Sequence, residues 1–358
     1  MNKRAWLILE DGTVFEGFSF GAEGKVTGEV IFTTSMTGFQ ETLTDPNYNN
    51  QIIVQTFPLV GNVGANSKDD SSDYGGAAGY IAREYCEFPS NFRMETTLDE
   101  FLKERGIVGL YGIDTRRLTR ILREKGTMNG QIADADPKSH ELDDFFESVR
   151  YLKQFKPETD LISAAEPVEY KTENAKYNIA LIDYGHKRSI VSLLNKLNCD
   201  VAVVPFTETS KNIIAGNYNG VVLSNGAGNP ADCTEEIEAI KALVNAKIPL
   251  LGIGLGHQLL ALANGGATAK LKHGHRGANL PVIDLETGRT FITTQNHGYI
   301  VEGIPEQAGK ITHINANDKT CEGISYNNIK ALSMQFVPSD EGGVNATVCF
   351  IEKFLRLI

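Results

Sequence analysis

The chain has 358 residues, which is too long for one core, so two domains are expected. With 41% hydrophobic and 22% charged residues, its composition is that of an ordinary globular protein. Its formal net charge of -11 argues against nucleic acid or an anionic membrane as a main partner, because both bind basic surfaces. The sequence contains no apolar run near the roughly 18 residues of a membrane span, and its five cysteines form no C-x-x-C pair, which favours a reducing, cytoplasmic setting without disulfides.

Residues 1–154 are predicted to form a mixed α/β domain. Up to about residue 60, short apolar runs alternate with turn signals such as Asp11-Gly12 and Asp45-Pro46, which is typical of short strands. Apolar residues three or four apart then predict helices in 98–105 and 115–125.

Residues 155–176 lack a hydrophobic period and are predicted to connect the two domains over the surface. In 177–358, near-continuous apolar strands alternate with helical patterns, which predicts a mainly parallel sheet flanked by helices. The strands are expected at 179–182, 201–204, 221–223 and 249–253, and the helices at 189–197 and 235–244.

The segment 252–260 reads Gly-Ile-Gly-Leu-Gly-His-Gln-Leu-Leu, in which a buried strand turns sharply into a helix through closely spaced glycines. A nucleophile elbow has this shape, because it lifts one side chain off the sheet beside the N–H groups of a helix start. The lifted position is Gly254, which has no side chain. On shape alone, a plain glycine turn explains the segment as well.

The run Gly-Ile-Gly-Leu-Gly-His-Gln resembles the elbow of class I glutamine amidotransferases, and closely that of carbamoyl phosphate synthetase small subunits, which carry cysteine at the position of Gly254. Segments 270–282 and 294–299 match the same family in order, and Leu-Ser-Asn-Gly-Ala-Gly-Asn-Pro at 223–230 resembles its S-N-G-P-G-D-P loop. Segments 28–41 and 113–120 resemble only the small-subunit first domain, so the likeness spans nearly the whole chain.

The resemblance implies a cysteine nucleophile, a histidine base and a glutamate that orients the histidine. The last two lie in a Q-G-H-P-E segment, which here reads Gln-Phe-Val-Pro-Ser, so Val337 and Ser339 occupy their places. With Gly254 at the nucleophile position, the catalytic relay is predicted to be absent and glutamine hydrolysis lost. Family members also carry the histidines equivalent to His257 and His297, which are therefore predicted to be structural or pocket residues.

The resemblance also implies a glutamine pocket. Asn47 stands in place of a family serine and keeps its hydrogen-bonding ability, and Tyr299 stands in place of a phenylalanine and adds only a hydroxyl. The pocket either still recognises glutamine or persists because it packs, and both interpretations stay open. The carried-over positions are Asn47, Gly226, Gly228, Leu255, Gln258, Asn296, Gly298 and Tyr299.

In this family the small subunit docks on a large subunit that makes carbamoyl phosphate from bicarbonate, ATP and glutamine or ammonia, for arginine or pyrimidine synthesis. The expected function is therefore a structural or regulatory subunit of a heterodimer, with no cofactor or metal on this chain and with ATP and its metal on the large subunit. Two alternatives remain. One is a glutamine-sensing or competing paralogue without a catalytic role, and the other is a glutaminase with an unrecognised nucleophile such as Cys233, Cys321 or Cys349.

Overall fold

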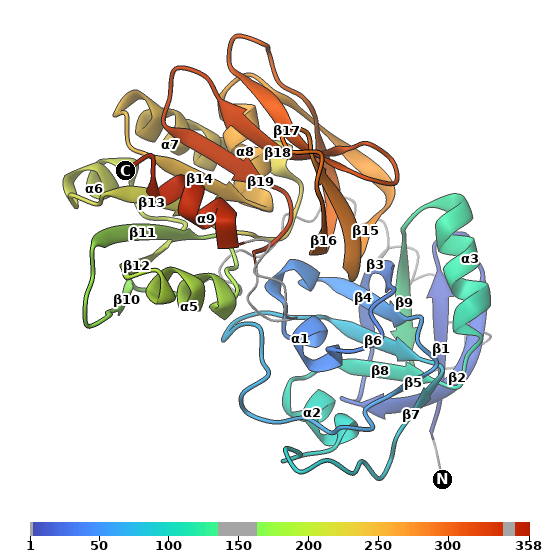
Figure 1. The fold of residues 1–358 in the computed structure, drawn as a ribbon. Coiled ribbons are helices and arrows are strands. Elements are labelled where there is room, and N and C mark those ends of the chain that lie inside the picture. The colour runs from blue at the N-terminus through green and yellow to red at the C-terminus, as the bar shows by residue number, and fades with distance from the viewer. Residues whose placement is uncertain (1–2, 135–162, 339–347) are drawn as a thin grey trace. The chain divides into compact units, whose positions relative to one another are not determined.

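The computed structural model describes residues 3–134, 163–338 and 348–358 (Figure 1). The chain divides into two compact units, Met1–Pro157 and Glu158–Ile358. Ser339, predicted to stand at the glutamate position, lies outside the described residues. In the part of the chain that the structure describes, no helix is long and apolar enough to cross a membrane.

The first unit is a closed barrel with strand order β1-β2-β8-β6-β4-β3-β9. It combines antiparallel pairs such as β1 with β2 and parallel pairs such as β3 with β4, so the predicted mixed architecture is confirmed. The strands are β1 Arg4–Leu9, β2 Val14–Gly21, β3 Val26–Thr33, β4 Gln51–Gln55, β6 Gly79–Ala82, β8 Val108–Tyr111 and β9 Met128–Ala133. A separate two-stranded sheet joins β5 Leu59–Val60 to β7 Glu84–Tyr85.

Helices α1 Phe39–Leu43, α2 Leu98–Glu104 and α3 Thr115–Lys125 belong to this barrel unit. A capping box between Thr97 and Glu100 begins α2, and the Asp114 side chain caps α3 by accepting from the Arg117 N–H. The buried side chains of α3, Thr115, Leu118 and Leu122, face the barrel, so its arginines stay outside.

The second unit is built on a ten-stranded sheet of order β10-β12-β11-β13-β14-β19-β18-β17-β15-β16. Strands β12, β11, β13, β14 and β19 run parallel, and the others extend the sheet with antiparallel pairs. The bounds are β10 Val168–Tyr170, β11 Tyr177–Asp183, β12 Cys199–Pro205, β13 Gly220–Leu223, β14 Leu250–Ile253, β15 Ala267–Asp284, β16 Thr290–Gly303, β17 Gly309–Asn315, β18 Cys321–Tyr326 and β19 Ala331–Met334.

Helices cover both faces of the parallel strands (Figure 1). One buried cluster joins the sheet to α6 Ser210–Ala215, α7 Thr234–Asn245 and α8 Leu255–Ala263. The other joins it to α5 Arg188–Lys196 and α9 Val348–Leu355. The predicted fold class is thus confirmed. Within the predicted connection 155–176, however, β10 pairs with β12 as an edge strand.

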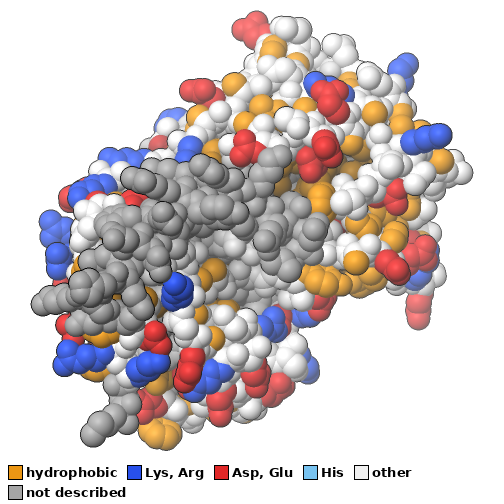
Figure 2. Space-filling view, turned by 180° about the vertical axis from the view of Figure 1, so that it is seen from behind, with side chains coloured by type: hydrophobic (Ala, Val, Ile, Leu, Met, Phe, Trp, Pro, Cys, Tyr) orange, Lys and Arg blue, Asp and Glu red, His pale blue; other side chains and the backbone are white. Residues whose placement is uncertain are grey.

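On one face of the molecule the described charged side chains are mixed rather than uniformly acidic (Figure 2). Figure 2 shows acidic and basic side chains interspersed over one face of the molecule. The net charge of -11 therefore does not appear on this face as a single acidic field.

Candidate functional site

The turn from β14 into α8 has the geometry of an elbow. Gly254 adopts φ 57° and ψ -112°, a backbone conformation that residues other than glycine rarely adopt. Its N–H donates to the Met334 carbonyl at 2.9 Å, which ties the turn to the end of β19. The sharp strand-to-helix turn predicted from the glycine spacing is therefore present.

Two neighbouring glycines are needed for close packing. A Cβ added at Gly256 would lie 2.2 Å from the Leu223 carbonyl oxygen, and one at Gly252 would lie 2.6 Å from the Gly256 oxygen. A Cβ at Gly254 would meet the Asn225 Cβ at 3.1 Å and the Gln335 oxygen at 3.9 Å. Position 254 thus faces Asn225 and the end of β19, and a side chain there would press on Asn225 and be strained by the positive φ.

The residues after β19 pack into an apolar cluster. Val337 is buried, and its N–H donates to the Thr294 carbonyl at 3.3 Å. Phe336 is fully buried and meets the Phe350 ring edge-on, with ring centroids 5.1 Å apart. The position assigned to a histidine base is therefore occupied by a side chain in hydrophobic core, with no proton-accepting atom.

Four of the predicted pocket residues lie together beside the elbow. The buried Gln258 side chain donates to the Tyr299 carbonyl at 2.8 Å and to the Gln335 side-chain oxygen at 3.0 Å. An added Cβ at Gly226 would lie 2.9 Å from a Leu255 methyl carbon. Among the described residues, the buried Nε2 of Gln335 has no hydrogen-bond partner, so its N–H groups are available to donate to a ligand.

The other predicted pocket residues are more dispersed. Gly228 follows Gly226 on the loop after β13, with φ 104°. Asn296 pairs with Arg276 across β16 and β15, and a Cβ added at Gly298 would lie 3.3 Å from the Arg276 guanidinium. Asn47 belongs to the first unit, where its N–H donates to the Asp45 carboxylate at 3.0 Å.

His257 is a fully buried residue of α8. Its Nδ1 lies 2.7 Å from the Ser333 hydroxyl oxygen, and burial lowers the pKa of the imidazole to about 3. The imidazole is therefore neutral at physiological pH and held by a hydroxyl, which is compatible with the predicted structural or pocket role.

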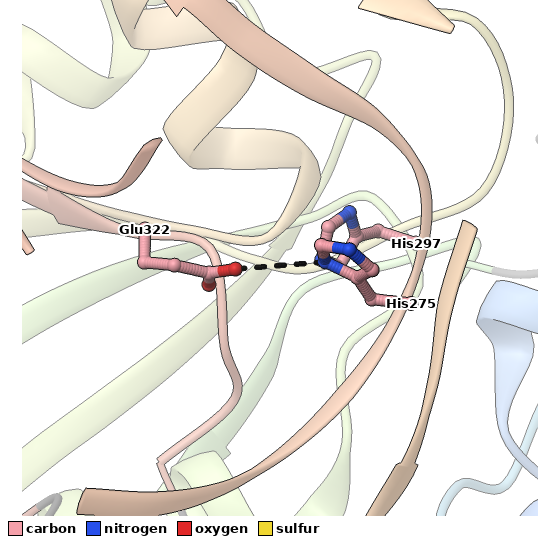
Figure 3. Close-up of side chains that lie close together, drawn as sticks. All are labelled: His275, His297 and Glu322. Carbon is pink, nitrogen blue, oxygen red and sulfur yellow. Dashed lines mark ion pairs between the residues drawn. The ribbon is translucent and has the colours of Figure 1, made fainter. Parts of the chain in front are cut away.

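His297 on β16, His275 on β15 and Glu322 on β18 form a cluster in which His275 is partly buried and the other two are buried (Figure 3). The two imidazole rings meet edge-on at 5.0 Å, and His275 Nδ1 lies 3.7 Å from a Glu322 oxygen. Burial lowers the pKa of His297 well below its usual range, and the charge of His275 adds to this effect. Burial also lowers the pKa of His275, but Glu322 and Asp318 outweigh it and raise the value overall.

These three side chains carry metal-ligating atoms within 4.8 Å of one another. Zinc binds imidazole nitrogen at about 2.0–2.1 Å, so two ligand atoms of one ion lie at most about 4 Å apart. Both nitrogens of His297 already meet other groups, Tyr299 oxygen at 2.8 Å and Gln295 Oε1 at 3.1 Å. In the observed geometry, the nitrogens of His297 thus face oxygens of β16 residues and not a shared ligand position.

Sequence reasoning missed an aspartate–histidine pair at the end of β11. His186 Nδ1 lies 2.8 Å from Asp183 Oδ1, and Asp183 also accepts three backbone N–H groups. Burial raises the pKa of this carboxyl, but the bonds to His186 and the backbone outweigh it and lower the value. Gly185, between the two residues, accepts from Asn225 at 2.7 Å, which links the pair to the elbow loop.

Comparison with known proteins decides the family. Residues 7–132 match the model of the carbamoyl-phosphate synthase small chain, CPSase domain, and residues 180–357 match that of class-I glutamine amidotransferases. A carbamoyl phosphate synthase small chain from Listeria monocytogenes is 46% identical over 361 residues, which cover 100% of this chain and 97% of the relative. The chain belongs to the carbamoyl phosphate synthase small-chain family.

Other relatives agree with this assignment. A carbamoyl phosphate synthase small chain from Bacillus cereus is 44% identical, with 98% of this chain and 95% of the relative covered. Among solved structures, a glutamine amidotransferase from Thermotoga maritima shares 20% identity over 45% of this chain and 75% of its own, with a TM-score of 0.36. The two curated small chains, covered to 97% and 95% of their own lengths, confirm the resemblance inferred from the motifs over the full small-chain length.

The elbow geometry predicts a measurable cost for any side chain at Gly254. We expect Gly254→Ala to lower the free energy of unfolding by on the order of 1–3 kcal/mol, because alanine would be strained at φ 57° and ψ -112° and would press on Asn225. Urea denaturation would measure it. Gly288→Ala is the control, since Gly288 has φ 71° but nothing within 4 Å of an added Cβ, and should cost about 1 kcal/mol. Equal losses in both variants would contradict the proposed crowding.

The buried histidines predict acid sensitivity. The folded pKa of His257 is about 3 and its unfolded value about 6.5, so the unfolded state binds more protons between these values. Stability is therefore complete above about pH 6.5 and falls as the pH drops, by about 1 kcal/mol from pH 7 to 5.5 for this residue. His257→Gln should flatten the dependence of unfolding free energy on pH by that amount. Ser333→Ala, which removes the hydroxyl but keeps the imidazole, should leave the slope intact, and a flattened slope there would argue against titration of His257.

Proposed function

We propose that this chain is a structural or regulatory small subunit of carbamoyl phosphate synthetase that docks on the large subunit without hydrolysing glutamine itself. The observation that carries the proposal is Gly254 at the elbow, where the family resemblance implies a cysteine. Glycine supplies no atom that can attack a carboxamide. The backbone shape of the site is kept, but its nucleophile is lost.

The base position supports the same proposal. A valine cannot accept a proton at any pH, and Val337 lies in a cluster with Met334 and Phe336. Phe336 stands where the family motif has glycine, and it fills the space against Phe350. Phe336 and Val337 thus belong to one packed apolar cluster, and replacing one of them alone would not create a catalytic site.

The cysteines offer no convincing replacement nucleophile. Burial raises the pKa of Cys199 and of Cys321 to about 12, so almost none of either thiol ionises at neutral pH. Burial also raises the pKa of Cys349. Cys233 is half-buried, with its sulfur 3.7 Å from the Asn229 carbonyl oxygen. These environments favour the structural-subunit proposal over a glutaminase with an unrecognised nucleophile.

The proposal assigns the remaining chemistry to the partner. The large subunit would bind ATP and its metal and would take free ammonia as the nitrogen source, with no cofactor on this chain. The role of the small chain is then to stabilise the large subunit or to set its activity.

A second candidate function, glutamine sensing, is favoured by the polar groups that persist beside the elbow. Gln258 remains anchored to Tyr299 and Gln335, and the buried Gln335 Nε2 has no partner among the described residues. A donor left unpaired in a buried site costs stability, and a ligand carbonyl would satisfy it. Glutamine would provide such a carbonyl.

The central prediction is that the purified complex with its large subunit releases no ammonia from glutamine above background. The same complex should make carbamoyl phosphate when ammonium is supplied, which provides the positive control. A coupled glutamate dehydrogenase assay would measure ammonia. Turnover with glutamine that survives Cys233→Ser, Cys321→Ser and Cys349→Ser in turn would contradict the proposal.

Restoring the relay should require all its parts. We expect Gly254→Cys alone to stay inactive, because without a base the thiol keeps a pKa near 8.5 and stays mostly protonated at pH 7. Adding Val337→His and Ser339→Glu should give a gain far above the sum of the separate changes. Single-turnover ammonia release would measure it. If Gly254→Cys alone is active, adding His186→Gln tests whether the His186–Asp183 pair acts as the base.

The sensing candidate predicts stabilisation by ligand. If glutamine binds, a concentration of ten times its Kd should stabilise the fold by about 1.4 kcal/mol, which is roughly 3 to 6 °C in Tm for a unit of this size. Scanning calorimetry with glutamine and with glutamate as the matched control would measure this. The shift should disappear in Gln258→Met. No shift for the parent chain at 10 mM glutamine would favour a pocket retained only for packing.

A further inference from the structure

A cavity of about 770 Å³ lies in the first unit, between the outer face of α3 and the segment around Pro58. Four arginines line it, together with Asp114 and three threonines. Three of the four project from one side of α3, at spacings of four and three residues. The four are Arg83, Arg116, Arg120 and Arg123.

These four guanidinium groups have no ion pair or hydrogen bond with any described residue. Other arginines of the same unit are paired, for example Arg4 with Glu16, Arg93 with Asp69 and Arg105 with Asp70. The Asp114 side chain is the only carboxylate among the residues lining the cavity, and it caps α3. Like charges three and four residues apart on a helix destabilise it. Although the chain has 45 acidic residues, these four cations lie together without a partner among the residues that the structure describes.

An apolar strip adjoins this cavity. It is carried by two segments that run side by side, since β5 pairs with β7 and the Ser90 N–H donates to the Asn62 carbonyl at 3.2 Å. Phe88 is 87% exposed and Phe92 is 95% exposed, which is unusual for aromatic side chains. The strip consists of Phe57, Leu59, Val63, Phe88 and Phe92.

The backbone connects the strip to the cavity. The Glu84 N–H donates to the Pro58 carbonyl at 2.9 Å, so Pro58, which lines the cavity, lies beside the start of β7. Arg83 immediately precedes that strand and lines the cavity as well. Basic and apolar features are therefore parts of one continuous surface within the first unit.

We propose that the arginine cavity and the apolar strip form the surface on which the large subunit docks, through an acidic segment flanked by apolar side chains. This inference rests on the proposed function, which requires such a partner. Arginine forks bind carboxylates in a bidentate manner, and exposed aromatic side chains gain most when a protein covers them. A free phosphate would satisfy the arginines but would leave the strip in water, so the observations favour a protein.

The decisive measurement is the Kd between the full chain and its cognate large subunit, obtained by biolayer interferometry over a range of salt concentrations. The triple variant Arg116→Gln/Arg120→Gln/Arg123→Gln should raise Kd at least about tenfold and reduce its dependence on salt, because charge complementarity governs both. Phe88→Ser/Phe92→Ser should raise Kd by a similar factor with the salt dependence unchanged.

The matched control is Lys3→Gln/Arg4→Gln/Lys103→Gln, which removes the same charge from three cations of the same unit that pair with Asp134, Glu16 and Asp99. It should change Kd less than twofold, since exposed pairs contribute little. All variants replace exposed side chains, and unchanged melting temperatures would show that they fold.

The outcomes separate the two levels of inference. If the parent chain does not bind the large subunit, the proposed function itself fails. If the parent binds and the arginine and phenylalanine variants bind equally well, only the docking surface is overturned. Calorimetric titration of the chain with inorganic phosphate and with ATP tests whether the cavity binds a small anion instead. Tight binding that the arginine triple variant abolishes, with the subunit Kd unchanged, would assign the cavity to a small anion and overturn the proposal.

Discussion

The close packing of α8 against the parallel sheet is the constraint on which the second unit depends. The first turn of α8 approaches β13 so closely that a Cβ at Gly256 would lie 2.2 Å from the Leu223 oxygen. For α8 to begin so close to β13, the chain turns sharply after β14, and it does so at Gly254, whose positive φ of 57° suits glycine. The same packing brings the Gln258 side chain within hydrogen-bonding distance of Tyr299 and Gln335. The position of this predicted pocket residue therefore follows from how α8 packs.

This coupling explains how the elbow can keep its shape without a nucleophile at position 254, as the proposed function requires. A residue with a side chain at position 254 would be held there at a cost in strain, which glycine removes. At the end of β19, Phe336 and Val337 add buried apolar surface where a polar relay would need hydrogen-bond partners. Both changes favour the folded state. If glutamine hydrolysis is lost as proposed, stability can increase at the positions to which the resemblance assigns the catalytic relay.

The sequence predicted the parallel part of the second unit well, because its strands and helices carry strong periodic signals. The helix expected at 235–244 is α7 Thr234–Asn245, and the strand expected at 249–253 is β14 Leu250–Ile253. The long antiparallel strands β15 and β16 gave no such signal, since β-bulges and glycines interrupt their alternation. Asn225 and the His186–Asp183 pair were missed for a different reason, because only folding brings them near the elbow.

The arginines of α3 illustrate a further limit of sequence reasoning. Their helical spacing is visible in the sequence, yet a run of charges on a helix usually marks a solvated face. What distinguishes this face is the absence of partners among the described residues, combined with the adjoining aromatic side chains on another segment. Repulsion between like charges on one helix costs about 0.2–0.5 kcal/mol per pair, and an acidic partner surface would offset it. In a family whose small chains work with a large subunit, a subunit interface is where that compensation belongs.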